Sequence, residues 1–591
     1  MKLKPTYIGS DNFRNLVLYN DVFIDKSLFI KDVLDDPWQV ILIARPRRWG
    51  KSINMNMLKT FLEIQVDKNG NEVENTNKKL FVGGEVIVDD GDSKLLKPLK
   101  IAQHLEIIKK HQGKYPVILL SLKGIEQDNY EDIKAGVKTK VQNLYRQHIH
   151  LLHSNNIDDT SKETILRYCK GDFANITELE DSLYFLTELL STHFHRKVWV
   201  LIDEYDSVMN KAHATFGKTK KDEFQTVVAL FKNLFVNCFK TTDYLQRGMF
   251  TGIIRIAKEE IFSGMNNIME YNILDNEYSN HYGFSQEEVD ELLEKVELNK
   301  ITRDDIKYWY NGYTFGDKYV YNPFSVMCCI GGDKTGLYWV ESGGTGLVDA
   351  SLLADSIQED LQKLLKRETI TSIIKTQFVF EDLNSSPTLL YSLLLFSGYL
   401  NAKIINWKIK EFELSIPNEE VAEIFQEKVS KWVLNKLQID ISTFAHFAQL
   451  LAKGDVQKFY DRLKKFLLES TSYNQLGENT EIFYEGFMLC LIYMTSGTHE
   501  IMSQVESGRG RPALILLPKQ GINNTGIVIE YKLGKEKDLL TSAKFGLNQI
   551  NEKKYDALLK KYDHITKIIK LSIAFWGKDV EMVWEVESLY I

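Results

Sequence analysis

The sequence has few cysteines, few prolines and no long apolar run. Its 591 residues include 5 cysteines and 10 prolines. The cysteines form no CxxC pair and no Cys/His spacing typical of zinc, and their odd number argues against a disulfide framework, so we expect a reducing, cytoplasmic environment. The longest apolar runs, such as 513–517 and 393–396, are too short to cross a bilayer, and residues 1–4 do not open a signal peptide. We therefore expect no membrane partner.

An excess of positive charge is also missing. The chain has 73 Lys and Arg against 81 Asp and Glu, a net charge of −8. This excludes a basic surface over the whole protein of the kind many nucleic-acid-binding proteins have, although a local basic groove remains compatible with it. Hydrophobic residues make up 44% and charged residues 26%, which is typical of globular proteins and excludes wholesale disorder. The length predicts several domains.

Short apolar segments alternate with amphipathic stretches over the first 255 residues. We expect strands at 40–44, 116–122, 198–202 and 248–254, and an inserted loop at 65–95. Continuous apolar strands separated by helices predict an α/β fold with a parallel sheet covered on both faces. From about 280 the pattern is mainly helical, and a helical stretch at 418–472 is expected to join two units. After about 480 the expected order is helix, strand, strand, helix, strand, which predicts a second, smaller α/β unit.

The strand 40–44 leads directly into a loop that ends in Gly-Lys-Ser and is followed by a helix. This segment is close to G-x-x-x-x-G-K-[ST], with Arg45 at the first glycine position. A loop rich in exposed amides at a helix N-terminus binds anions, Gly50 permits close backbone approach, Lys51 would reach the β- and γ-phosphates, and the Ser52 hydroxyl would hold Mg²⁺. A basic surface turn is the alternative. The predicted nucleotide-binding residues of the loop are Arg45, Pro46, Arg47, Arg48, Trp49, Gly50, Lys51 and Ser52.

Two carboxylates follow the strand 198–202. Ligands of open α/β sheets bind at the carboxyl ends of strands, so we predict that Asp203 binds Mg²⁺ and that Glu204 polarises the attacking water. The alternative is that these acids begin a solvated helix. Arg255 follows the strand 248–254 and could contact the γ-phosphate or form a structural salt bridge.

These segments resemble the divergent AAA-ATPase-like family. The resemblance rests on 25–27, 45–52, 201–206 and 251–255, with further matches at 262–267, 309–313, 321–325 and 416–421. Arg45 agrees with the variant loop of that family. The resemblance implies P-loop binding of ATP with Mg²⁺, and a C-terminal nuclease-like domain.

Glu530 and Lys532 lie two residues apart on an expected strand, so both side chains point to one face. Such a pair suits metal-dependent phosphodiester hydrolysis, although an exposed ion pair is the common alternative. The surrounding sequence resembles the PD-(D/E)XK nuclease superfamily at 481–485, 508–511 and 575–578, and at Gln549 followed by Tyr555. The resemblance implies catalytic roles for Glu530, Lys532 and Gln549, and Glu530 and Glu485 are the candidate metal ligands.

Ala513 stands where that superfamily has its principal metal-binding aspartate. An alanine cannot bind a metal, and Mg²⁺ sites use few protein oxygens, so nuclease activity is expected to be lost. Three explanations stay open: natural decay into a binding module, replacement by Glu506 or Glu485, and a laboratory substitution.

The predicted domains are an ATPase core (1–275), a helical, winged-helix-like lid (276–415), a helical connector (416–475) and the nuclease-like domain (476–591). The predicted function is an ATPase coupled to a nuclease-like domain that acts on DNA or RNA. The alternative is a nucleotide-switched scaffold that binds nucleic acid or protein without cutting. Homo-oligomers are compatible with either function.

Overall fold

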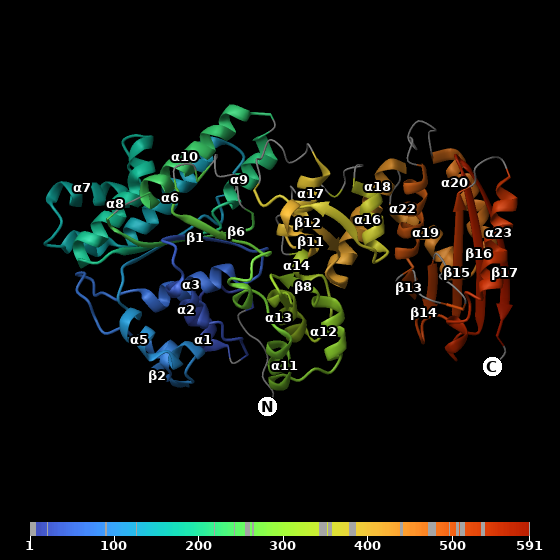
Figure 1. Cartoon of the computed structure of the whole chain (residues 1–591), viewed down its shortest axis with the longest axis horizontal. Coiled ribbons are helices and arrows are strands. Elements are labelled where there is room, and N and C mark those ends of the chain that lie inside the picture. The colour runs from blue at the N-terminus through green and yellow to red at the C-terminus, as the bar shows by residue number, and fades with distance from the viewer. Residues whose placement is uncertain are drawn as a thin grey trace. The chain divides into compact units, whose positions relative to one another are not determined.

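The computed structural model divides the chain into two compact units. Unit 1 comprises Met1–Val348 and Thr371–Val421, and unit 2 comprises Asp349–Ile370 and Ala422–Ile591. Figure 1 shows their elements along the chain. The residues described are 8–20, 22–88, 91–125, 127–217, 219–240, 243–254, 261–262, 265–341, 352, 357–377, 386–437, 441–470, 480–495, 497–503, 507–508, 514–533 and 538–589. Arg255, Glu506 and Ala513 lie outside them.

Unit 1 is built on a five-stranded parallel sheet with the strand order β4-β5-β6-β1-β7. The strands are β1 (Val40–Ala44), β4 (Val117–Ser121), β5 (Val198–Asp203), β6 (Leu245–Gly252) and β7 (Ile268–Tyr271). Every residue of β1 and β5 is buried, which explains their continuous apolar sequences. The structure confirms the predicted α/β fold.

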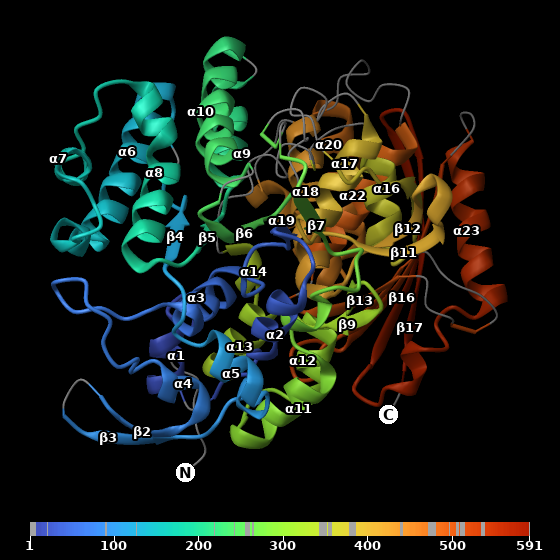
Figure 2. The same ribbon diagram turned by 60° about the vertical axis from the view of Figure 1, so that its left-hand side comes forward.

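Helices cover both faces of this sheet. In Figures 1 and 2, α6, α8 and α10 lie on one side and α3 lies on the other. The helices of this part are α1 (Phe13–Tyr19), α2 (Leu28–Asp35), α3 (Lys51–Leu62), α4 (Lys78–Val82), α5 (Leu105–His111), α6 (Tyr130–Gln147), α7 (Asp159–Cys169), α8 (Ile176–Phe194), α9 (Ser207–Ala212) and α10 (Lys221–Phe239). The stretch expected to be a loop contains α4 and an antiparallel hairpin, β2 (Gly84–Ile87) and β3 (Ser93–Leu96).

The rest of unit 1 mixes helices with short strands. Its helices are α11 (Gln286–Lys295), α12 (Arg303–Tyr310), α13 (Pro323–Gly332), α14 (Tyr338–Glu341) and α17 (Pro387–Phe396). The strands β8 (Tyr313–Phe315) and β9 (Lys318–Val320) form a hairpin, and β10 (Ile370–Ile373), β12 (Glu411–Ser415) and β11 (Asn401–Asn406) form a sheet in that order. The expectation of a mainly helical segment therefore missed two small sheets.

Unit 2 has a five-stranded mixed sheet between two layers of helices. Its strand order is β13-β14-β15-β16-β17, and β15 and β16 are its parallel pair. The strands are β13 (His499–Ser503), β14 (Leu514–Pro518), β15 (Thr525–Leu533), β16 (Lys567–Trp576) and β17 (Asp579–Ser588), and the helices are α16 (Gln358–Leu365), α18 (Glu419–Leu437), α19 (Ile441–Ala452), α20 (Val456–Ser470), α22 (Thr480–Tyr493) and α23 (Leu539–Lys553). Two strands, β13 and β17, were not expected from the sequence.

The alternation of side chains along β14 places them in two cores. Leu514 and Leu516 pack in one core with α19, α20 and α22, whereas Ile515 and Leu517 pack in the other with α23. The helices expected to form a separate connector are therefore one layer of unit 2, because their apolar faces are buried against its sheet. No helix among the described residues combines the length and the apolar composition that a bilayer span requires.

Candidate functional site

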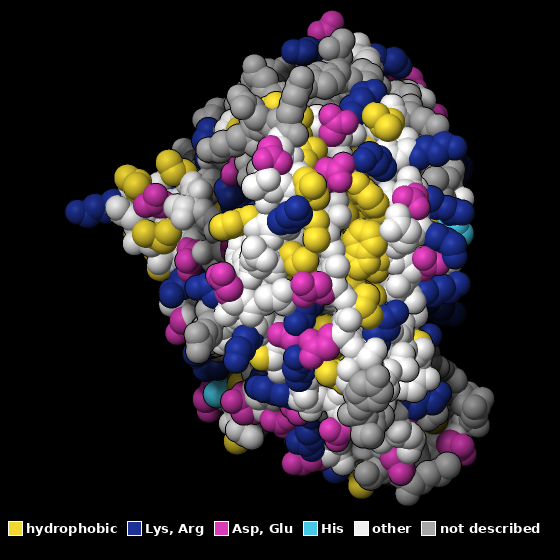
Figure 3. Space-filling view, turned by 90° about the vertical axis from the view of Figure 1, so that its right-hand side faces the viewer, with side chains coloured by type: hydrophobic (Ala, Val, Ile, Leu, Met, Phe, Trp, Pro, Cys, Tyr) yellow, Lys and Arg dark blue, Asp and Glu magenta, His cyan; other side chains and the backbone are white. Residues whose placement is uncertain are grey.

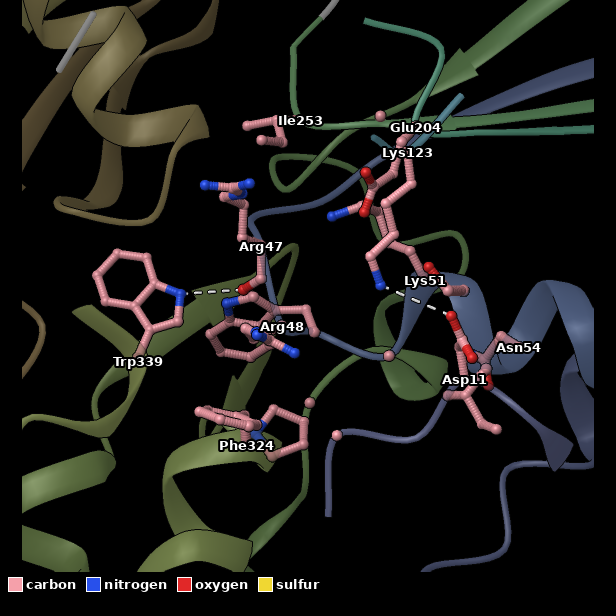
Figure 4. A pocket seen from close by; sticks show the side chains of 18 of the residues that line it. Asp11, Arg47, Arg48, Lys51, Asn54, Lys123, Glu204, Ile253, Phe324 and Trp339 are labelled. Atoms are coloured by element: carbon pink, nitrogen blue, oxygen red, sulfur yellow. Dashed lines mark hydrogen bonds and ion pairs between the residues drawn. The ribbon is translucent and has the colours of Figure 1, made fainter. Parts of the chain in front are cut away.

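A cavity of about 750 Å³ lies in unit 1 at the carboxyl ends of β1, β5 and β6. Its walls come from the loop between β1 and α3, from the ends of β5 and β6, from the segment before α1, and from α13, α14 and α17. Figure 4 shows charged side chains of the loop and of the strand ends on its walls. The position agrees with the rule that open parallel sheets bind ligands at the carboxyl ends of their strands.

The loop between β1 and α3 lies on the wall of the cavity and leads into the N-terminus of α3. Gly50 precedes α3 with a φ of 84°, a left-handed conformation that glycine adopts without strain. Among the described residues, no side chain caps the first turn of α3. The first N–H groups of a helix lack intrahelical partners and attract anions, so this helix end can receive a phosphate.

Lys51 lies inside the loop and contacts its backbone. The Lys51 Nζ atom donates hydrogen bonds to the carbonyl oxygens of Arg45 (2.9 Å) and Pro46 (2.6 Å). Burial lowers the pKa of Lys51 to about 8, and the nearby carboxylates of Glu204 and Asp206 oppose this shift. A phosphate group would give this buried ammonium a counterion and favour its charged form.

The side chain of Arg45 points away from the cavity. It is fully buried and donates hydrogen bonds to the carbonyl oxygens of Ala44 (2.9 Å), Tyr271 (3.1 Å) and Glu277 (3.1 Å). Arg45 was predicted to bind nucleotide, but neither it nor Pro46 is among the cavity-lining residues. In this structure the Arg45 side chain ties the start of the loop to the end of β7.

Two further residues of the loop contact the α13–α14 part of unit 1. Arg48 stacks on the ring of Phe324 at 4.7 Å, and the Trp339 Nε1 atom donates a hydrogen bond to the Arg47 carbonyl oxygen at 2.9 Å. Trp49 lines the cavity but is fully buried, because its ring packs against those of Tyr313 and Phe315. Trp339 and Phe324 lie far from the loop in the sequence, so no local motif could have identified them.

Hydrogen bonds hold the ends of β5 and β6 together. Thr251 Oγ1 donates to Asp203 Oδ1 at 2.5 Å, and the Asp206 carboxylate accepts the backbone N–H groups of Ile253 (2.9 Å) and Ile254 (3.0 Å). Asp206 was not singled out from the sequence, although it follows the predicted acidic pair by two residues. These contacts fix the strand end that precedes Arg255, which itself is not described.

Glu204 lies at the end of β5 and lines the cavity. Its φ of 55° is unusual for a residue other than glycine, and such backbone conformations cluster at functional sites. Burial and then the neighbouring Asp203 raise the pKa of Glu204, while Lys51 opposes the shift. A carboxylate with a raised pKa is a better proton acceptor, which suits the predicted role in activating water.

The residues present fit a Mg²⁺–nucleotide complex. Ser52, Glu204 and Asp206 line the cavity, so a hydroxyl and carboxylates are at hand, whereas Asp203 is buried at the end of β5, is not among the lining residues and accepts a hydrogen bond from Thr251. The described residues contain no group of three His, Cys, Asp or Glu side chains that could hold a metal alone. Mg²⁺ commonly uses one or two protein oxygens together with substrate phosphates, so this small donor set is compatible with it only when nucleotide is bound.

In unit 2 the predicted pair on β15 forms an ion pair. Lys532 Nζ lies 2.7 Å from Glu530 Oε1, and the two side chains are 28% and 8% exposed. Gln549 donates to the Tyr555 hydroxyl at 3.1 Å. The side chain of Glu485 is not described, and Ala513 precedes β14, whose first residue pairs with Ile529 beside Glu530. Within the described residues no group of three His, Cys, Asp or Glu side chains that could hold a metal ion occurs here.

Comparisons with known proteins match both parts of the chain. A family described as predicted AAA-ATPase matches residues 7–83 and 85–262, and the PD-(D/E)XK nuclease superfamily matches residues 479–585. An uncharacterized protein in the vnfD 5′ region of Azotobacter chroococcum is 22% identical over 565 residues, which cover 94% of this chain and 93% of that protein. The Walker-type ATPase PABY2304 of Pyrococcus abyssi matches with a TM-score of 0.32 and 10% identity, over 68% of this chain and 94% of that chain.

Proposed function

The chain combines an N-terminal AAA-ATPase-like domain with a C-terminal PD-(D/E)XK nuclease-like domain, and from this premise we propose that it binds and hydrolyses ATP in unit 1 and engages DNA or RNA through the nuclease-like part of unit 2. The observation that carries the ATPase proposal is the geometry of one cavity. An uncapped helix N-terminus, the buried Lys51 and the carboxylate of Glu204 all line it. Few ligands other than a polyphosphate require this combination of donors and a base.

In this proposal the backbone amides before α3 and the Lys51 ammonium hold the phosphates. Ser52 and Asp203 would hold Mg²⁺, which would supply neutralisation of phosphate charge when it is bound with ATP. Glu204 accepts a proton from water as the new bond from oxygen to the γ-phosphorus forms, and the bond to the bridging oxygen of ADP breaks. ADP and inorganic phosphate then leave.

The ATPase proposal is tested by comparing two lysines of α3. Lys51→Ala removes the ammonium in the loop, whereas Lys59→Ala removes an ammonium of the same helix that pairs with Glu63 at 2.6 Å. We expect Lys51→Ala to abolish ATP binding in calorimetry and phosphate release in a turnover assay, and Lys59→Ala to retain both. The ATPase proposal fails if Lys51→Ala binds and turns over ATP as the unchanged protein does.

For unit 2 we propose binding of nucleic acid without cleavage. Its support is the superfamily match together with Ala513, which offers no metal ligand where that superfamily has an aspartate. In Figure 3, basic and acidic side chains of the described residues are interspersed on the face drawn, which favours a local site over a broad basic surface. Binding of labelled single- and double-stranded DNA and RNA should fall steeply with salt, and no product should form with Mg²⁺ or Mn²⁺.

Two variants separate binding from cutting in unit 2. Lys532→Met should weaken nucleic-acid binding, because it removes the ammonium of the site, whereas Lys465→Met on α20 should not. Ala513→Asp restores a carboxylate beside β14 and should produce Mg²⁺-dependent cleavage. If Ala513→Asp binds nucleic acid but never cuts it, the result favours the alternative of a scaffold without nuclease activity. If neither the unchanged protein nor Ala513→Asp binds DNA or RNA at low salt, the nucleic-acid proposal is wrong.

A further inference from the structure

Lys123 occupies a fixed place beside the acidic end of β5. It follows β4 by two residues, and the preceding Leu122 donates its N–H to the Asp203 carbonyl oxygen at 3.0 Å. Ser121 pairs with Asp203 in the register of the two parallel strands. Lys123 therefore lines the cavity from the side of the edge strand β4, and Figure 4 shows it beside Glu204 with its ammonium directed toward Asp11.

The ammonium of Lys123 has a weak partner, the carboxylate of Asp11. Its Nζ atom lies 3.7 Å from Asp11 Oδ2, and the two side chains are 60% and 62% exposed. Exposed ion pairs at this distance stabilise a protein by little, because both charges remain hydrated. Lys123 can therefore leave Asp11 with little loss.

The charges on the cavity wall predict where Lys123 goes when a triphosphate enters. Asp11 and Glu204 both line the cavity, and Lys123 is near enough to Glu204 for its charge to oppose the rise that burial causes in the pKa of that carboxyl group. A triphosphate repels Asp11 and attracts Lys123. Because Glu204 is the group placed to activate the attacking water, the phosphate nearest to it, and thus nearest to Lys123, is the terminal one.

We propose that Lys123 exchanges the carboxylate of Asp11 for the γ-phosphate of ATP and so distinguishes the triphosphate from the diphosphate. This inference rests on the proposed binding of ATP in the cavity. It makes Lys123 a contact to the reacting phosphate that neither the P-loop sequence nor the acidic strand end indicates. It also means that Asp11, in the segment before α1, loses its ion pair with Lys123 when the terminal phosphate binds.

The test compares affinities for a non-hydrolysable ATP analogue and for ADP, measured by calorimetry with Mg²⁺. Lys123→Met should weaken binding of the analogue about tenfold, the loss expected for one phosphate contact, and should change ADP binding less than about twofold. Lys123→Arg should retain most of the preference of the unchanged protein for the ATP analogue over ADP. The matched control is Lys110→Met, an exposed lysine of α5 outside the cavity, which should bind both nucleotides as the unchanged protein does.

A double-mutant cycle with Asp11→Asn tests the exchange itself. In the presence of Lys123, removing the Asp11 charge should strengthen binding of the ATP analogue, because the competing partner is gone. In the Lys123→Met background the gain should be smaller, since only repulsion is relieved. The inference is overturned if Lys123→Met weakens both nucleotides equally, or if the two substitutions are additive. If the unchanged protein binds neither nucleotide, the proposed ATPase function falls as well.

Discussion

Replacing Arg45 by glycine separates two roles for the first position of the phosphate loop. The general P-loop sequence has glycine there, so a phosphate-binding role for Arg45 predicts weaker ATP binding and unchanged stability in Arg45→Gly. The structure instead predicts that Arg45→Gly mainly lowers the stability of the protein. The guanidinium group is buried, donates three hydrogen bonds to backbone carbonyl groups, and lies 5.3 and 5.5 Å from the ring centroids of Tyr282 and Phe315.

The expected loss of stability follows from these contacts. Burial lowers the pKa of Arg45 to about 10, which corresponds to a cost of about 3 kcal/mol for keeping the charge in the interior. Hydrogen bonds to a charged group contribute about 1.5–3 kcal/mol each, and three of them exceed that cost. With the cavity left by the side chain, we expect Arg45→Gly to lower the free energy of unfolding by about 3–5 kcal/mol.

The assay is urea unfolding followed by tryptophan fluorescence, with ATP binding measured separately on the folded fraction. Arg146→Ala is the matched control, because Arg146 also donates to a backbone carbonyl group, that of Cys169 at 2.9 Å, but from an exposed position. Arg146→Ala should lower the free energy of unfolding by less than about 1 kcal/mol. An Arg45→Gly protein as stable as the unchanged one would refute the reasoning, whatever its affinity for ATP.

Two further outcomes are expected. Trp339→Phe keeps an aromatic side chain, although a smaller one, but removes the N–H that bonds the Arg47 carbonyl oxygen, so it should weaken ATP binding a few-fold in calorimetry. An unchanged affinity would show that this bond does not position the loop. In unit 2, burial raises the pKa of Asp556, but hydrogen bonds from Lys560 and Lys570 outweigh burial, so the pKa is lowered. A hydrogen bond from Lys560 likewise lowers the pKa of Glu587. Carboxyl groups with lowered pKa values stabilise the fold at neutral pH and lose that contribution as pH falls through those values, so Lys570→Met should reduce the urea midpoint at pH 7 but progressively less below about pH 4.

The sequence predicted most strands of the two five-stranded sheets, including the edge strand β4, but missed β7, β13 and β17. β1 and β5 are buried on both faces, so their apolar runs stand out, and β14 and β16 share this property. β17 instead alternates buried Val580 and Met582 with acidic residues, because one side of this edge strand reaches solvent. The hairpin of β2 and β3 is exposed over most of its length, and each of its four-residue strands buries only one apolar side chain, so its apolar pattern is too short to stand out.

The same limit applies to the candidate site. The motif gave the backbone positions of Gly50, Lys51 and Ser52, because their spacing follows from the loop and the helix that it begins. It could not give the direction of the Arg45 side chain, which depends on carbonyl groups contributed by the β7 region. Trp339 and Lys123 approach the loop from elements separated from it by many residues, and nothing local in their sequence indicates a ligand.

The contacts of Trp339 give the phosphate loop a physical route to a long helix. Besides the bond from its ring to Arg47, the Trp339 backbone N–H donates to Glu420 Oε1 at 2.7 Å, and Ser325 Oγ donates to Glu420 Oε2 at 2.8 Å. Glu420 is fully buried and lies in the first turn of α18, a helix that starts in unit 1 and continues into unit 2. A buried carboxylate with such partners cannot lose one of them without a large cost. These hydrogen bonds therefore connect the carbonyl oxygen of Arg47, through Trp339, to the first turn of α18.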